Sequence, residues 1–199
     1  IGDGTSANGV SNLRLITSTV AGGGVLANIL DSNSQISRVY VSGTLTGSGL
    51  AVGGLIGEAK VNSTVTNSYA AVNVTVNSSA STGGLIGVGR GSVTTSAASG
   101  NVTQSNSGDN KTGGLVGMLY GSVTNCFARG TVTSSAPYST GGLVGRADGS
   151  NGRSFVTKSL AIGNVVIIGG GGYSGGLVGS TYIATIQNSY ATGNVTTGT

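Results

Sequence analysis

Few side chains in this sequence are of the kinds that perform acid–base or metal chemistry. Its 199 residues include no His and only five carboxylates, which are Asp3, Asp31, Glu58, Asp109 and Asp148. These acids fall on unrelated positions of the repeat described below. Enzymes that hydrolyse glycosidic bonds need paired carboxylates, and calcium sites need several oxygen ligands together. We therefore expect no enzyme activity, no catalytic residue, no metal site and no cofactor.

The glycine-rich segments raise the question of a phosphate-binding loop. A loop of the Walker type needs a Gly-Lys-Ser/Thr sequence at the start of a helix. No Gly-Lys pair occurs among the 39 glycines, and no helical periodicity follows the glycine pairs. We instead expect these glycines to turn corners, either through a positive φ or by allowing another backbone segment to approach closely.

Charge and cysteine content exclude other classes of protein. The net charge is +4, but the nine basic residues are scattered and form no run, which argues against a nucleic-acid groove. No stretch of 18 apolar residues is present, so no membrane-spanning segment is expected. Cys126 is the only cysteine, and it falls in a column of mostly Ser, where a small buried residue is expected.

The elements that carry these residues are copies of one short sequence. A variant of Gly-Gly-Leu-Val-Gly begins at Gly23, Gly53, Gly83, Gly113, Gly141 and Gly175, with spacings of 30, 30, 30, 28 and 34 residues. A fixed period of this size is typical of repeat architectures. Frequent Val, Thr and Ile in alternation favour strands over helices.

Aligned copies form columns that predict a stack of coils. The column that opens the second half of each repeat reads Val10, Ile36, Val65, Val93, Val123, Val156, Ile186. Columns three, five and nine positions later are small or apolar and should face inward, with Val74, Val102 and Val132 in register. The column two positions later contains four Asn residues, and a bend is expected there because Asn tolerates turn geometry.

The fold class expected from these columns is all-β, a single right-handed parallel β-solenoid of about six coils with about 30 residues per coil. At about 4.8 Å per coil the stack is roughly 30 Å long. We expect one repeat domain over residues 1–199, with an atypical first coil at 1–30 and regular repeats at about 23–196.

Two outward columns are candidate interaction surfaces. The column four positions after the opening residue is apolar or aromatic after its first copy, and a contiguous apolar stripe on a surface needs an explanation. The alternative is that the bend turns the alternation the other way, so that these side chains stack inside the core. This interaction stripe consists of Tyr40, Tyr69, Phe127, Leu160 and Tyr190. A second pair of columns forms a Thr/Asn face, which consists of Thr44, Thr46, Asn73, Thr75, Asn101, Thr103, Thr131, Thr133, Asn194 and Thr196.

The repeat resembles the GLUG motif, named for its Gly-Leu-any-Gly core. Residues 53–57 with 67–70, and residues 175–179 with 188–193, are the best matches, and the resemblance extends over about 23–196. The first copy departs from the pattern, since Ala27 replaces its last glycine. The motif occurs in large secreted bacterial surface proteins, including adhesins, so the resemblance implies an extracellular or cell-surface location. It brings no catalytic residues.

The function expected is a structural or adhesive repeat module of a secreted or cell-surface protein. Two alternatives stay open. One is a subunit that stacks into an extracellular filament, and the other is an ice-binding β-solenoid that uses the Thr/Asn face. The expected partners are other protein subunits or repeats, bound end to end or laterally, or a host or surface receptor, and not nucleic acid.

Overall fold

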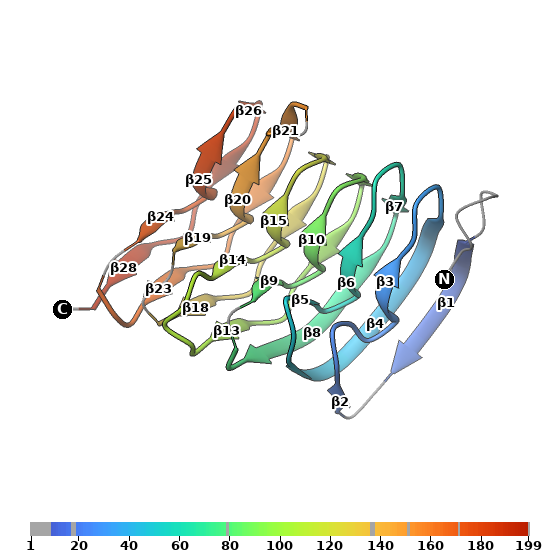
Figure 1. The fold of residues 1–199 in the computed structure, drawn as a ribbon, viewed down its shortest axis with the longest axis horizontal. Coiled ribbons are helices and arrows are strands. Elements are labelled where there is room, and N and C mark those ends of the chain that lie inside the picture. The colour runs from blue at the N-terminus through green and yellow to red at the C-terminus, as the bar shows by residue number, and fades with distance from the viewer. Residues whose placement is uncertain are drawn as a thin grey trace.

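The computed structural model describes residues 9–16, 19–78, 80–135, 138–150, 152–170 and 172–198. Every element in them is a β-strand, and the strands wind into a β-solenoid of about six turns, as the sequence predicts. Successive coils lie side by side along the long axis of the molecule, with the N-terminus at one end and the C-terminus at the other (Figure 1). None of the described residues forms a helix of the length and apolar character needed to cross a bilayer.

Each regular coil passes through three sheets in turn. The first sheet consists of β5 (Ala51–Gly53), β9 (Ser81–Gly83), β14 (Lys111–Gly113), β19 (Ser139–Gly141) and β24 (Tyr173–Gly175). The second consists of β3 (Ala27–Leu30), β6 (Ile56–Ala59), β10 (Ile86–Gly89), β15 (Val116–Leu119), β20 (Val144–Asp148) and β25 (Val178–Tyr182).

The third sheet contains the second half of every repeat. It begins with β1 (Gly9–Ile16), β2 (Val20–Ala21), β4 (Gln35–Gly47), β7 (Thr64–Thr66) and β8 (Tyr69–Val76). From the next coil onward, each coil adds three short strands. These are β11 (Ser92–Thr94), β12 (Ala97–Ala98) and β13 (Val102–Gln104), then β16 (Ser122–Thr124), β17 (Phe127–Ala128) and β18 (Val132–Ser134), then β21 (Ser154–Thr157), β22 (Leu160–Ala161) and β23 (Val165–Ile167), then β26 (Ala184–Gln187), β27 (Tyr190–Ala191) and β28 (Val195–Thr197).

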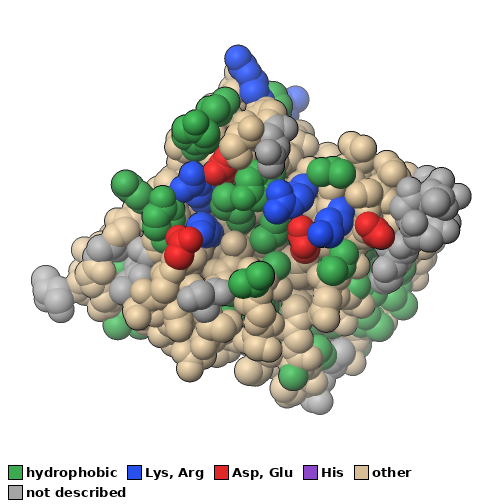
Figure 2. All heavy atoms as spheres, viewed as in Figure 1, with side chains coloured by type: hydrophobic (Ala, Val, Ile, Leu, Met, Phe, Trp, Pro, Cys, Tyr) green, Lys and Arg blue, Asp and Glu red, His purple; other side chains and the backbone are tan. Residues whose placement is uncertain are grey.

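The surface of the solenoid is uneven in charge. Figure 2 shows Lys, Arg, Asp and Glu side chains gathered over the upper half of one face, along strands of the second sheet, while the lower half is largely uncharged. Charges that are scattered in the sequence are therefore brought together by the stacking of coils.

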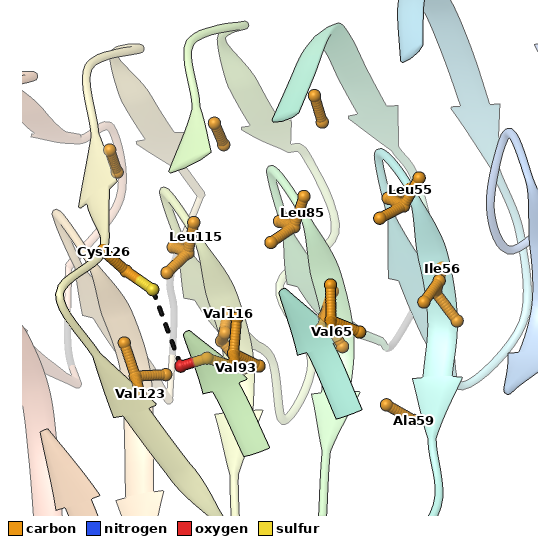
Figure 3. Close-up of a cluster of buried hydrophobic side chains, with 14 of the residues drawn as sticks. Leu55, Ile56, Ala59, Val65, Leu85, Val93, Leu115, Val116, Val123 and Cys126 are labelled. Carbon is orange, nitrogen blue, oxygen red and sulfur yellow. Dashed lines mark hydrogen bonds between the residues drawn. The ribbon is translucent and has the colours of Figure 1, made fainter. Parts of the chain in front are cut away.

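The core is built from columns of identical or similar residues. Val74, Val102 and Val132 pair in parallel register, as predicted, and all three are buried. Val65, Val93 and Val123 form a second column, and Leu55, Leu85 and Leu115 a third, which enters the core directly after the glycine pairs (Figure 3). Because equivalent residues lie one above another, each buried side chain packs against near-copies of itself.

The predicted bend lies at the Asn column. All seven residues of this column have φ between 47° and 55°, and they are Asn12, Arg38, Asn67, Thr95, Asn125, Lys158 and Asn188. This left-handed conformation is unfavourable for most side chains but tolerated by Asn. It separates β7 from β8, β11 from β12 and the equivalent strands of later coils, and it reverses the alternation of inward and outward side chains.

The bend is closed by a hydrogen-bonded ladder of small polar residues one position further on. The backbone N–H of Ser68 donates to Ser96 Oγ at 3.1 Å, and that of Cys126 donates to Ser159 Oγ at 3.1 Å. Each hydroxyl in turn donates to the carbonyl oxygen two residues before it, as Ser96 does to Thr94 at 2.8 Å. This ladder explains why the buried column is Ser and not a larger apolar residue.

The motif glycines are required for close approach and not for a positive φ. None of the glycines in the five regular motif copies is among the positive-φ glycines of the described residues. A Cβ added to Gly114 would lie 2.2 Å from the carbonyl oxygen of Gly142 and 2.9 Å from the Cβ of Ala128. Of the two reasons considered for these glycines, the approach of the neighbouring coil is the correct one.

Replacing Gly114 with Ala is expected to destabilise the protein by about 1–3 kcal/mol or more, because the new methyl group meets backbone that cannot move aside without displacing the next coil. Gly170→Ala is the matched control, since nothing lies within 4 Å of a Cβ at that position. Urea denaturation of both variants measures the difference. Equal stability of the two would contradict the close-approach explanation.

Replacing Ser96 with Ala is expected to cost about 1–3 kcal/mol, because it leaves the buried N–H of Ser68 without an acceptor. Ser96→Cys is the control, since Cys126 already occupies the same column and accepts the N–H of Ser96 at 3.4 Å. In thermal unfolding, the melting temperature of Ser96→Cys should be much closer to that of the parent than the melting temperature of Ser96→Ala is. The reverse order would show that the ladder contributes little.

Candidate functional site

The interaction stripe lies outside the core, on the third sheet. Its members are in register from coil to coil, Tyr40 beside Tyr69, Phe127 beside Leu160 and Leu160 beside Tyr190. Tyr40, Tyr69, Phe127 and Leu160 are half-buried and Tyr190 is exposed, whereas residues next to them in sequence, such as Ala70 and Ala128, are buried. Its role in binding stays a prediction.

Neighbouring rings and cations order part of this stripe. The rings of Tyr40 and Tyr69 stack with centroids 5.7 Å apart. The Arg14 guanidinium lies 5.4 Å from the Tyr40 centroid, and that of Arg129 lies 5.0 Å from Phe127. Stacked rings and overlying cations restrict rotamers, so the stripe is an ordered surface.

Asparagines of the Thr/Asn face take part in stacking. Asn73 Oδ1 accepts the backbone N–H of Asn101, and Asn101 Oδ1 accepts that of Thr131, each at 2.9 Å. Asn164 Oδ1 accepts the N–H of Asn194 at 3.0 Å. These amides satisfy backbone donors between coils, which gives a structural reason for their recurrence. Ice binding by this face stays a prediction, and thermal hysteresis measures it directly.

A groove that the sequence did not predict lies on the charged face. It has a volume of about 1060 Å³, and its side-chain lining includes Asp109, Lys111, Met118, Tyr138, Arg146, Asp148 and Tyr173. A second hollow of about 380 Å³ shares Tyr138, Arg146 and Tyr173 with it and adds Tyr182. The two tyrosines therefore form a ridge between two depressions.

Three successive coils supply these residues. Lys111 on β14 pairs in register with Ser139 on β19, which pairs with Tyr173 on β24. Met118 on β15 lies beside Arg146 on β20. Strand pairing thus fixes the spacing of most of the lining, and Tyr138 lies immediately before β19.

Tyr138 is the centre of the groove's contacts. Its ring meets that of Tyr173 edge to face, with centroids 6.1 Å apart. Lys111 Nζ lies 5.2 Å and Arg146 Cζ 5.6 Å from the Tyr138 centroid, and Arg146 Nη1 donates to the Tyr138 hydroxyl at 3.1 Å. These contacts hold the ring in place while leaving 41% of Tyr138 and 60% of Tyr173 exposed.

Each cation of the groove has a carboxylate partner. Lys111 Nζ lies 2.7 Å from Asp109 Oδ2, and Arg146 Nη2 lies 2.9 Å from Asp148 Oδ2. Asp148 is only 6% exposed, and its other oxygen accepts the backbone N–H of Ser150 at 2.9 Å. The groove therefore combines two cations and two anions without an excess of either charge.

The hydrogen bonds around Asp148 shift two pKa values. Burial by itself raises the pKa of Asp148, but hydrogen bonds from Ser150 and Arg146 outweigh burial and lower it overall. Burial by itself lowers the pKa of Arg146, but its bonds to Tyr138 and Asp148 raise it overall.

Outside the groove, burial raises the pKa of the Cys126 thiol to about 11, so that the thiol stays protonated at neutral pH. The described residues contain no group of three or more His, Cys, Asp or Glu side chains placed to hold a metal ion.

The sequence held a weak signal for this groove. Lys111 and Tyr173 both stand two positions before a glycine pair, and Arg146 stands five after one. An alignment of the copies on those glycines places the three residues on adjacent coils. A search for recurring residues does not detect them, because the copies differ at these positions.

The comparison with family models fits this architecture. The model of the GLUG motif matches residues 108–133 and 170–196. The chain therefore carries the GLUG motif in at least two of its coils, and both matched segments contribute residues to the groove. Comparisons with curated proteins and with solved structures found no significant match.

The stability of the protein is expected to fall in acid partly through Asp148. Because the folded pKa of Asp148 is below the unfolded value near 3.8, its ionised form favours folding. That contribution is fully present above the unfolded pKa and is lost as the pH falls through the folded value. Urea denaturation between pH 6 and pH 2 should show a smaller decrease in the free energy of unfolding for Asp148→Asn than for the parent. The control is Asp109→Asn, because the Asp109 side chain is 67% exposed. An equal decrease in Asp148→Asn and in the parent would refute the role of this carboxylate.

Proposed function

We propose that this chain is a non-catalytic structural or adhesive repeat module of a secreted or cell-surface protein. The proposal rests on the role of the residues that recur in successive repeats. The glycines, the Asn bend, the Ser ladder and the apolar columns all serve the stacking of coils. Several residues that vary between copies, such as Lys111, Arg146 and Tyr173, line the surface, as expected of a rigid support with a variable surface.

The adhesive part of the proposal is supported by the interaction stripe. It runs along one sheet and contains four aromatic side chains, of which Tyr40, Tyr69 and Phe127 are half-buried and Tyr190 is exposed. The buried Ala97 interrupts it between Tyr69 and Phe127. Tyr and Phe are enriched in protein interfaces because they provide much contact area at a low cost in rotamer entropy. The GLUG motif supports the extracellular setting.

A second candidate function is self-stacking into an extracellular filament. Successive coils pair in parallel register through the same columns, as Val74 does with Val102 and Val165 with Val195. Because each coil packs against a near-copy of itself, a coil of a second copy of the chain offers a surface of the same kind. Sedimentation over a wide range of protein concentration distinguishes this candidate, since a self-stacking subunit forms larger species as concentration rises.

The adhesive role is tested by coating beads with the chain and measuring their retention under flow on surfaces of immobilised glycan, immobilised protein and bare polymer. We expect retention on at least one surface above that of beads coated with an inert protein at the same density. The double variant Tyr69→Ser, Tyr190→Ser should lose most of this retention, because it removes two of the four rings of the stripe.

The control is Thr103→Ser, Thr133→Ser, a double change on a neighbouring outward column. It should keep both the retention and the melting temperature of the parent. If the tyrosine variant unfolds instead, the stripe is part of the packing of the solenoid and not an interface. Retention no higher than that of inert beads on all three surfaces would overturn the adhesive role.

A further inference from the structure

The groove around Tyr138 and Tyr173 has features that the stacking of coils does not require. Other coils carry Ser81 or Ser139 where Lys111 and Tyr173 stand in the first sheet. In the second sheet they carry Ile29, Glu58, Val88 or Ser180 where Met118 and Arg146 stand. Strand pairing is therefore compatible with smaller side chains at these positions. The large side chains of the groove therefore need another explanation.

The exposed rings indicate a ligand with flat apolar faces. Tyr138 is 41% exposed although its coil has neighbouring coils on both sides, and its ring stands edge to face against that of Tyr173. Since Lys111 and Arg146 already fix Tyr138, little side-chain entropy remains to be lost when a ligand binds there. An aromatic surface held ready in this way suits the C–H face of a sugar ring or another flat apolar group.

The paired charges indicate that this ligand is neutral. Both cations lie within 2.9 Å of a carboxylate oxygen, so an anion would have to compete with Asp109 and Asp148 and a cation with Lys111 and Arg146. A hydroxyl group both donates and accepts, so it can bond to a carboxylate and to the cation beside it without separating them. Several hydroxyls at fixed positions match two such ion pairs.

The shape of the groove indicates more than one sugar unit. The main hollow of about 1060 Å³ is an open depression and not an enclosed pocket, and the second hollow of about 380 Å³ adjoins it at Tyr138 and Tyr173. A linear ligand that crosses the ridge would contact both hollows, with Tyr182 and Ser180 at the far side.

We propose that this groove binds a neutral oligosaccharide, with sugar faces packed on Tyr138 and Tyr173 and sugar hydroxyls bonded to the Lys111–Asp109 and Arg146–Asp148 pairs. The proposal rests on the proposed adhesive role in that it names a ligand for it, but binding in the groove can be measured whether or not the chain is adhesive. It does not involve the interaction stripe, which lies on the third sheet.

The test is a titration of the intact chain with linear oligosaccharides of four to six units, separately of glucose, galactose, mannose and N-acetylglucosamine. The chain contains seven Tyr and no Trp, and Tyr138, Tyr173 and Tyr182 line the two hollows. A change in tyrosine fluorescence that Tyr173→Ala abolishes therefore reports contact with the groove, and calorimetry supplies the affinity. We expect at least one of the four sugars to bind with a dissociation constant in the millimolar range or tighter. Tyr173→Ala should weaken that binding at least tenfold, whereas Tyr173→Phe should keep most of it because the ring face is retained.

Phe155→Ala is the matched control, because Phe155 is an aromatic residue of the same fold, 39% exposed, outside both hollows. It should leave the affinity unchanged. Circular dichroism should show that all three variants keep the strand content of the parent, which Tyr173→Ala is expected to do because the side chain it removes is mostly exposed.

Three outcomes overturn the proposal. The first is the absence of binding by all four neutral sugars at 10 millimolar, a concentration on the order of weak single-site saccharide affinities. The second is binding only to a sulfated polysaccharide, lost in 0.5 M salt, which would make the site electrostatic. The third is an equal loss in Tyr173→Ala and Phe155→Ala. None of these outcomes alters the bead-retention result for the stripe, so failure of the groove and failure of the adhesive role are distinguishable.

Discussion

The spacing of parallel strands between successive coils is the constraint on which the rest of this structure depends. Neighbouring backbones in a parallel sheet lie about 4.8 Å apart, so a position that faces the next coil's backbone has room only for a hydrogen atom. Gly114 illustrates this, because an added Cβ would lie 2.2 Å from the carbonyl oxygen of Gly142 in the next coil. The same constraint applies in every coil, and the glycines therefore recur with the coil period.

Sequence columns predicted the fold because a stacked coil places like residues together. The valine register, the Leu column and the bend at Asn12, Asn67 and Asn125 were all predictable, since each recurs and each has a local physical cause. The Ser ladder was visible only as a small-residue column. That its hydroxyls accept N–H groups from the preceding coil depends on the direction in which the left-handed bend turns the backbone, which the sequence alone does not specify.

The groove was not predictable for the opposite reason. Its residues occur once each, because the copies carry different side chains at these positions. Strand pairing places Tyr173 beside Ser139, but the contact between the Tyr173 and Tyr138 rings depends on side chains that do not recur with the coil period. The carboxylates fall on unrelated repeat positions, yet Asp109 and Asp148 line the same hollow, because stacking places side chains of different coils along one face.

Position along the stack also bears on how a ligand would affect stability. In a solenoid each coil is stabilised mainly by its neighbours. Lys111, Arg146 and Tyr173 belong to three successive coils. A ligand that contacts all three residues binds only the stacked form of these coils, and by mass action it raises the free energy needed to separate them. Recognition in the groove and order at this part of the solenoid are therefore thermodynamically coupled.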